Sequence, residues 1–155
     1  MTEELINSLL DLTDSTTLFL ESVKGATLRV SVDAQSEEEE NAICLITRTT
    51  RLFFLSPETP ALFCMSRLYK NELTDDEYRS LIETDTPIGK VFLNFNEARL
   101  IEKKNLTIAL GNDSNIATRL YVNDCMLYRK EYDYIVGGRK IGRIREFFNE
   151  ESLRR

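Results

Sequence analysis

Apolar residues recur along the chain with two periods, and these periods predict where helices and strands lie. Spacings of three and four residues predict a short helix over Glu3 to Leu12, with its leucines and Ile6 on one face. The hydroxyl and carboxylate residues 14–17 offer N-caps for a second helix, which Gly25 ends. Strict alternation from Leu28 to Val32 then predicts a half-buried strand.

The middle of the chain predicts a hairpin followed by helices. Thr74 and Glu77 have capping-box spacing, and Thr86-Pro87 is a second helix start with the proline at the first helical position. The predicted elements are a solvated acidic loop (residues 37–40), two strands (41–55 and 61–69) around a proline-containing turn (56–60), two helices (74–82 and 86–93), a strand (99–110), a loop (111–115) and one or two helical turns (116–122).

The last predicted element is a hairpin over residues 127–148, where two runs rich in aromatic and β-branched residues flank Gly137-Gly138. Counting by twos, Glu146 shares a strand face with Ile144 and Gly142. Helices, strands and hairpins in this order predict an α+β fold. We expect a single domain over residues 1–155, with one antiparallel sheet of about six strands and helices packed to one side.

The amino-acid composition limits the kinds of catalysis and ligand binding that are possible. The 155 residues are 42% hydrophobic, enough for one core, and include no histidine and no glycine-rich phosphate loop. Histidine-based catalysis, imidazole metal sites and nucleotide chemistry are therefore excluded, and we expect no metal and no cofactor. A net charge of −6 argues against nucleic acid as a partner. The absence of a long apolar run and of a leader predicts a cytoplasmic protein without a membrane partner, and three cysteines without CxxC spacing predict reduced, mostly buried thiols.

Two charged residues are candidates for a site. Arg51 interrupts an apolar strand, where it either reaches solvent at the strand end or is buried against an anionic partner, such as a ligand carboxylate. Glu146 is either an edge charge or a carboxyl group in an apolar cavity, suited to proton transfer or to binding a hydroxyl.

Other polar groups are better explained by structure. Arg129, Arg143 and Arg145 form a basic patch typical of a solvated strand face. The tyrosines 128, 132 and 134 lie on one face of the predicted strand and are expected to pack against other side chains. Cys64 is expected to be a residue of the hydrophobic core. The acidic residues 75–77 carry metal-ligand chemistry, but helix capping accounts for them.

Four segments in this order resemble the chorismate pyruvate-lyase family and its archaeal and cyanobacterial relatives. They are Leu12 to Phe19 with the strand after it, the segment Arg51-Leu52-Phe53-Phe54-Leu55 before a turn, Thr86-Pro87-Ile88-Gly89, and Arg129 to Phe148 with Glu146-Phe147-Phe148.

The resemblance implies a six-stranded antiparallel sheet with an enclosed cavity, a fold shared with ligand-binding domains of bacterial regulators. It implies that Arg51 binds a ring carboxylate, that Glu146 meets the ring hydroxyl, and that Thr16 and Ile88 lie near the cavity. The implied reaction is a cofactor-free elimination of pyruvate from chorismate that gives 4-hydroxybenzoate. The chain departs from the family at Lys140 and Asn149, which replace prolines, and at residues 142–143. A glycine at 142 leaves room for a larger ligand.

Three hypotheses follow. The chain is a chorismate lyase that needs Arg51 and Glu146, a non-catalytic module that binds an aromatic carboxylate in the same cavity, or an interaction domain whose two charges lie on the surface.

Overall fold

The computed structural model describes residues 2–12, 15–55, 58–92 and 101–153. Its helices are α1 (Thr2–Asp11), α2 (Thr16–Lys24), the 3-10 helix η1 (Lys70–Glu72), α3 (Asp75–Glu83), α4 (Ile88–Val91), α5 (Ser114–Arg119) and α6 (Glu150–Leu153). Its strands are β1 (Arg29–Glu40), β2 (Ile43–Leu55), β3 (Glu58–Tyr69), β4 (Ile101–Asn112), β5 (Met126–Val136) and β6 (Arg139–Phe148). Within the described ranges, no helix is long and apolar enough to cross a membrane.

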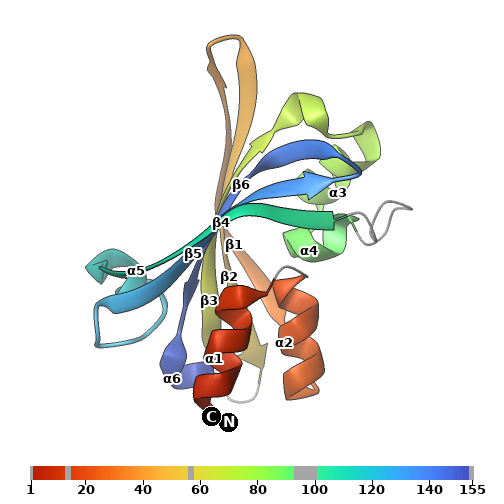
Figure 1. Ribbon diagram of the computed structural model, residues 1–155. Helices are drawn as coiled ribbons and strands as arrows, with labels where there is room; N and C mark the ends of the chain where they lie inside the picture. Colours follow the sequence, from red (N-terminus) through yellow and green to blue (C-terminus); the bar gives the residue numbers. More distant parts are fainter. Residues whose placement is uncertain (1, 13–14, 56–57, 93–100, 154–155) are drawn as a thin grey trace.

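The strands form one six-stranded sheet in the order β1-β2-β3-β6-β5-β4, and every neighbouring pair is antiparallel. This confirms the predicted α+β fold (Figure 1). Because side chains alternate along a strand, the sheet has two distinct faces. We call the face packed against α1, α2 and α4 the inner face, and the opposite one the outer face.

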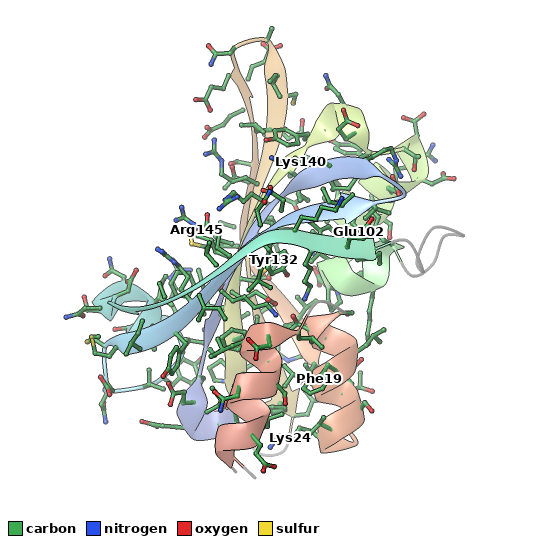
Figure 2. All side chains as sticks on the ribbon, viewed as in Figure 1. Phe19, Lys24, Glu102, Tyr132, Lys140 and Arg145 are labelled. Atoms are coloured by element: carbon green, nitrogen blue, oxygen red, sulfur yellow. The ribbon has the colours of Figure 1, made fainter. Side chains whose placement is uncertain are left out.

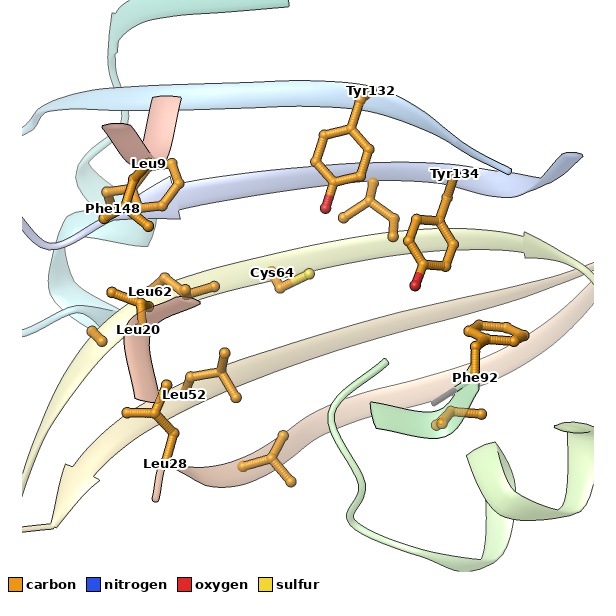
Figure 3. Close-up of a cluster of buried hydrophobic side chains, with 14 of the residues drawn as sticks. Leu9, Leu20, Leu28, Leu52, Leu62, Cys64, Phe92, Tyr132, Tyr134 and Phe148 are labelled. Atoms are coloured by element: carbon orange, nitrogen blue, oxygen red, sulfur yellow. The ribbon is translucent and has the colours of Figure 1, made fainter. Parts of the chain in front are cut away.

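The inner face carries most of the core (Figure 3). Leu9 of α1, Leu20 of α2 and Val91 of α4 pack in one cluster with the inner-face side chains of the sheet, which include Leu62 and Ile144. Within the described ranges, the outer face is covered at one end, where α5 packs on Phe63 and Phe147 in a second, smaller cluster. Short α5 is therefore the exception to the predicted one-sided arrangement of helices.

Local capping explains where the helices begin. The Thr74–Glu77 capping box is present as predicted, and Ser15 caps α2 by accepting from the backbone N–H of Leu18. Gly25 ends α2 with a φ of 64°, a left-handed conformation that suits glycine.

The structure corrects four local predictions. Residues 37–40 are not a loop, because they pair with residues 43–46 of β2 and form an arm that projects beyond the other strands (Figure 1). Residues 111–112 extend β4, and Asp113 caps α5 by accepting from the backbone N–H of Ile116. Pro60 lies in β3 beside a register shift in β2, and Pro87 is the N-cap of α4 rather than its first residue.

Four predicted features fall outside the described residues. They are the cap at Asp14, the turn residues 56–57, the helix end at Leu93, and the strand start at residues 99–100.

Candidate functional site

Glu146 lies in the middle of the inner face and is only 3% exposed. Its cross-strand neighbours are Cys64 on β3 and Lys130 on β5. Thr50 on β2 is opposite Cys64, so these four polar or titratable residues form one row across the sheet, all of them buried. A row of this kind in a core requires partners, because a buried polar group is costly unless it is hydrogen-bonded.

The first partner of Glu146 comes from α2. Thr16, at the first position of that helix, donates its hydroxyl proton to Glu146 Oε1 over 3.1 Å. The same hydroxyl oxygen accepts a hydrogen bond of 3.0 Å from the Lys103 ammonium of β4. Lys103 also lies over the ring of Tyr132, 4.7 Å from its centroid. A threonine thus connects a buried carboxylate to a buried cation.

A second buried lysine supports the helix in front of the site. The Lys130 ammonium donates to the carbonyl oxygen of Leu9, at 2.7 Å, and to that of Leu12, where α1 ends. Burial, together with the nearby charge of Lys103, lowers the pKa of Lys130 to about 8. Its position at a helix C-terminus, whose carbonyls favour a cation, assigns it a structural role.

Burial dominates the electrostatics of the neutral groups around Glu146. It raises the pKa of the Cys64 thiol to about 12, with a further contribution from the Glu146 charge. The same two causes raise the pKa values of the Tyr132 and Tyr134 hydroxyls well above their usual range. Cys64 is therefore a thiol rather than a thiolate, which agrees with its assignment to the core.

Arg48 is the most unusual residue of the inner face. It lies on β2, two residues before Thr50, and is 1% exposed. Its guanidinium donates to the carbonyl oxygen of Thr86 over 3.0 Å, but its Nε forms no hydrogen bond and no described carboxylate lies within ion-pair distance. Burial accordingly lowers its pKa.

Two more polar atoms of the inner face lack partners among the described residues. The side-chain carbonyl of Gln35, the β1 residue directly opposite Arg48, and the hydroxyl of Tyr134 are both buried without a hydrogen bond. In Figure 3 the Tyr132 and Tyr134 hydroxyls point from β5 into the space between the sheet and the segment that carries Phe92. Buried polar groups normally find partners, so three unsatisfied atoms on one face need an explanation.

Two small cavities lie in front of Glu146 among the described residues. Their volumes are about 20 and 30 Å³, each with room for a water molecule. Glu146, Tyr132, Thr17 and Ile88 line both cavities, and Thr16 and Lys103 line the smaller one. Gly89 lets α4 come close to α2, since a side chain there would meet Ser15 Oγ at 2.6 Å.

Arg51 is not part of this arrangement. Its neighbours Thr50 and Leu52 face inward, so its own side chain points to the outer face. There its guanidinium binds both carboxylate oxygens of Asp33, at 2.8 and 3.1 Å, and it also contacts Tyr121. The expectation that Arg51 and Glu146 point into one cavity is therefore corrected. Adjacent residues of a strand point to opposite faces, so Arg51, between Thr50 and Leu52, points away from the face that carries Glu146.

Thr16, Ile88 and Glu146, which the sequence resemblance placed near a cavity, do come together. Arg48, Lys103 and Lys130 were missed. The position of Arg48, in step with Thr50 and Leu52, was the available signal, whereas the two lysines carry no local sign of burial.

Comparisons with known proteins bear on the fold. No protein-family model and no curated protein matches the chain. Solved structures do match it. The effector domain of PhnF from Mycobacterium smegmatis aligns with a TM-score of 0.66 and 13% identity over 89% of this chain and 90% of that domain. The structure of PhnF itself aligns with a TM-score of 0.60 and 12% identity, over 88% of this chain and 64% of PhnF.

A third similar structure is the ligand-binding domain of a regulator from Bordetella bronchiseptica that is assigned to the GntR family. It has a TM-score of 0.54 and 13% identity over 79% of this chain and 82% of that domain. Identities this low show a shared fold alone. The six-stranded sheet and its helices agree with the chorismate lyase-like fold of such regulator domains.

Proposed function

We propose that this chain is a small-molecule binding module, and that its site lies on the inner face between the sheet and helices α2 and α4. The observation that carries the proposal is Arg48, a fully buried guanidinium with an unsatisfied Nε and no carboxylate partner among the described residues. A buried charge without an ion pair costs several kcal/mol, and the charge of Asp85 acts on Arg48 only from beyond ion-pair distance. A ligand with an anionic group would supply the missing partner.

The ligand class follows from the groups on this face. An arginine binds a carboxylate through two parallel hydrogen bonds, which favours a carboxylate-bearing ligand. Glu146 and Thr16 offer an acceptor and a hydroxyl, and Tyr132 offers an aromatic surface. Arg48 lies two strands away from Glu146, about 10 Å across the sheet, which suits a ligand of one ring. We therefore propose a small cyclic or aromatic carboxylate with a hydroxyl group.

The similar solved structures support a binding role. One of them is a ligand-binding domain and another is an effector domain, both from regulator proteins. If this chain uses the shared fold in the same way, its function is to hold an effector without converting it.

Chorismate lyase activity is the second candidate. Its supporting observation is Glu146, a carboxylate enclosed beside Thr16 where it could orient a ring hydroxyl. In this version Arg48, not Arg51, binds the ring carboxylate. The enolpyruvyl C–O bond breaks as the ring loses a proton, and aromatisation drives the step.

One experiment separates the two candidates. Purified protein is incubated with chorismate, 4-hydroxybenzoate, benzoate and cyclohexane carboxylate, thermal unfolding is recorded, and chorismate samples are analysed for pyruvate by chromatography. A binding module is stabilised by at least one carboxylate, by about 2.7 kcal/mol at a hundredfold excess over Kd, and releases no pyruvate. Glu146→Gln should weaken the stabilisation by a hydroxylated ligand more than that by benzoate.

Release of pyruvate that Glu146→Gln abolishes would establish the lyase instead. If no carboxylate shifts the unfolding temperature at millimolar concentration and no pyruvate appears, both candidates fail.

A further inference from the structure

The outer face holds a feature that the inner site does not explain. A groove of about 640 Å³ crosses the sheet there, bounded at one end by α5, and this volume is in the range of sites for small organic ligands. We propose that this groove is a second binding site, for a small organic anion with an apolar ring or chain. The proposal does not depend on the function of the inner face.

Small side chains make the groove. Ala34, Thr49 and Ala109 lie on β1, β2 and β4 at outer-face positions where larger residues would fill it, and Gly111 has no side chain. The floor between them is apolar. Phe63 and Phe147 meet edge to face at a centroid distance of 6.3 Å and continue into the α5 cluster. The hollow is thus built into several strands and does not depend on one loop.

Three arginines line this apolar floor. They are Arg119 of α5, Arg129 of β5 and Arg145 of β6, and their side chains are between 41% and 50% exposed. The carboxylate of Asp33 lies 3.5 Å from Arg119 Nη1. A basic strand face is ordinarily only solvated, but here the cations surround a recess with an aromatic base.

Buried Glu131 orients two of the three arginines. Its carboxylate lies 3.2 Å from Arg145 Nε and 3.9 Å from Arg129 Nε. A guanidinium approached at Nε keeps its terminal N–H groups available for a second acceptor. Burial raises the pKa of Glu131, but the hydrogen bonds and the positive charges of Arg143 and Arg145 together lower it below its usual value. In Figure 2, Arg145 lies on the same side of the sheet as α5.

Charge and shape together define the ligand. The terminal N–H groups of arginine bind planar oxyanions such as carboxylate, sulfonate and phosphate. The rings of Phe63 and Phe147 offer contact to an apolar body. The chain carries a net charge of −6, so a concentration of arginines around one hollow is a local feature and not a property of the whole surface.

The test uses a matched pair of probes and a matched pair of variants. Anilinonaphthalene sulfonate is an apolar anion whose fluorescence reports binding, and phenylnaphthylamine is its uncharged analogue. We expect saturable binding of the sulfonate, about tenfold weaker in Arg145→Gln and in Arg119→Gln because each loses a charge-assisted hydrogen bond. Arg143→Gln is the control, since Arg143 has the same charge and also pairs with Glu131 but does not line the groove.

Three results would overturn the proposal. They are equal affinity for the neutral analogue, equal weakening by Arg143→Gln and Arg145→Gln, and loss of sulfonate binding in Glu146→Gln, which would place the probe on the inner face. Concentration-dependent dimerisation that Arg145→Gln abolishes would show instead that the groove holds the acidic arm of a second copy. These results do not depend on whether a carboxylate ligand binds on the inner face. Either proposal can therefore be wrong while the other is right.

Discussion

Arg48 and Arg51 lie three residues apart on β2, and their opposite directions give the two guanidinium groups different energetics. Arg51 is paired with Asp33 and partly exposed, so its charge is compensated. Arg48 is buried with one hydrogen bond to a backbone carbonyl. A protein retains a costly group of this kind where it serves function rather than stability.

Replacing Arg48 with methionine should therefore not destabilise the ligand-free protein. Methionine fills much of the same volume without a charge to desolvate, and we expect the free energy of unfolding in urea to be unchanged or to rise by up to about 2 kcal/mol. Arg51→Met should instead lower it by roughly 1 kcal/mol, since Asp33 loses its bidentate partner. A loss above about 2 kcal/mol in Arg48→Met would make Arg48 a structural residue.

Cys64 predicts how stability depends on pH. Its folded pKa is raised from 9.0 to about 12 by burial, so above pH 9 the unfolded chain loses this proton while the native protein keeps it. The folded state binds more protons in that window, and stability must fall as the pH rises from 9 toward 12. Between pH 9 and pH 10.5, wild type should lose about 2 kcal/mol more than Cys64→Ala, measured by urea unfolding. An equal loss of unfolding free energy in wild type and Cys64→Ala would contradict the assignment of this pH dependence to Cys64.

At the scale of elements, β3 and β6 approach each other closely at Gly142. A side chain at Gly142 would place its Cβ 2.1 Å from the carbonyl oxygen of Arg67, which is backbone and cannot move aside. The sequence suggested that this glycine leaves room for a larger ligand. Its role is instead to let two strands pair.

Gly142→Ala should accordingly separate β3 from β6, on which Glu146 also lies. We expect a loss of at least about 2 kcal/mol in the free energy of unfolding. Gly111→Ala on β4 is the matched control, because nothing lies within 4 Å of its added Cβ. Gly111→Ala should stay within about 0.5 kcal/mol of wild type. Equal stability of the two variants would show that β3 and β6 tolerate a wider separation.

The elements that local patterns determine could be predicted from the sequence. The closing hairpin, the Thr74 capping box and the end of α2 at Gly25 depend on neighbouring residues only, and each is present. The acidic residues 37–40 could not be placed, because their strand conformation depends on pairing with β2 and not on their own propensity.

The candidate site could be predicted only in part, for a related reason. Residues 52–55 of β2 are all apolar, so alternation there does not identify the inner face. The position of Arg48 in step with Thr50 and Leu52 shows that the three share a face, but not which face is buried under the helices. Lys103 and Lys130 find their partners more than 80 residues away in sequence. Glu146 was a candidate from its place in the alternation of the last strand, whereas Thr16 was named only through the family resemblance.

At the scale of the whole molecule, the described part of the inner face has little free space beside Glu146. The cavities of about 20 and 30 Å³ there hold no organic ligand, so we expect α2 and α4 to move when one enters. Hydrogen exchange should show this. We expect the amides of α2 and α4 to exchange more slowly when a carboxylate is bound, while those of α3, which does not line the cavities, remain unchanged. Uniform protection of all three helices would indicate global stabilisation without local opening.

The most direct test of the central claim is to measure carboxylate affinity in the two arginine variants. We would titrate wild type, Arg48→Met and Arg51→Met calorimetrically with the carboxylate that stabilises wild type. This experiment compares removal of an arginine from the inner face of β2 with removal of one from its outer face. We predict that Arg48→Met weakens binding by a factor of about 30 or more, the effect of losing a bidentate charged contact, and that Arg51→Met binds as wild type does. Undiminished binding by Arg48→Met, or a loss confined to Arg51→Met, would contradict the assignment of the site to the inner face.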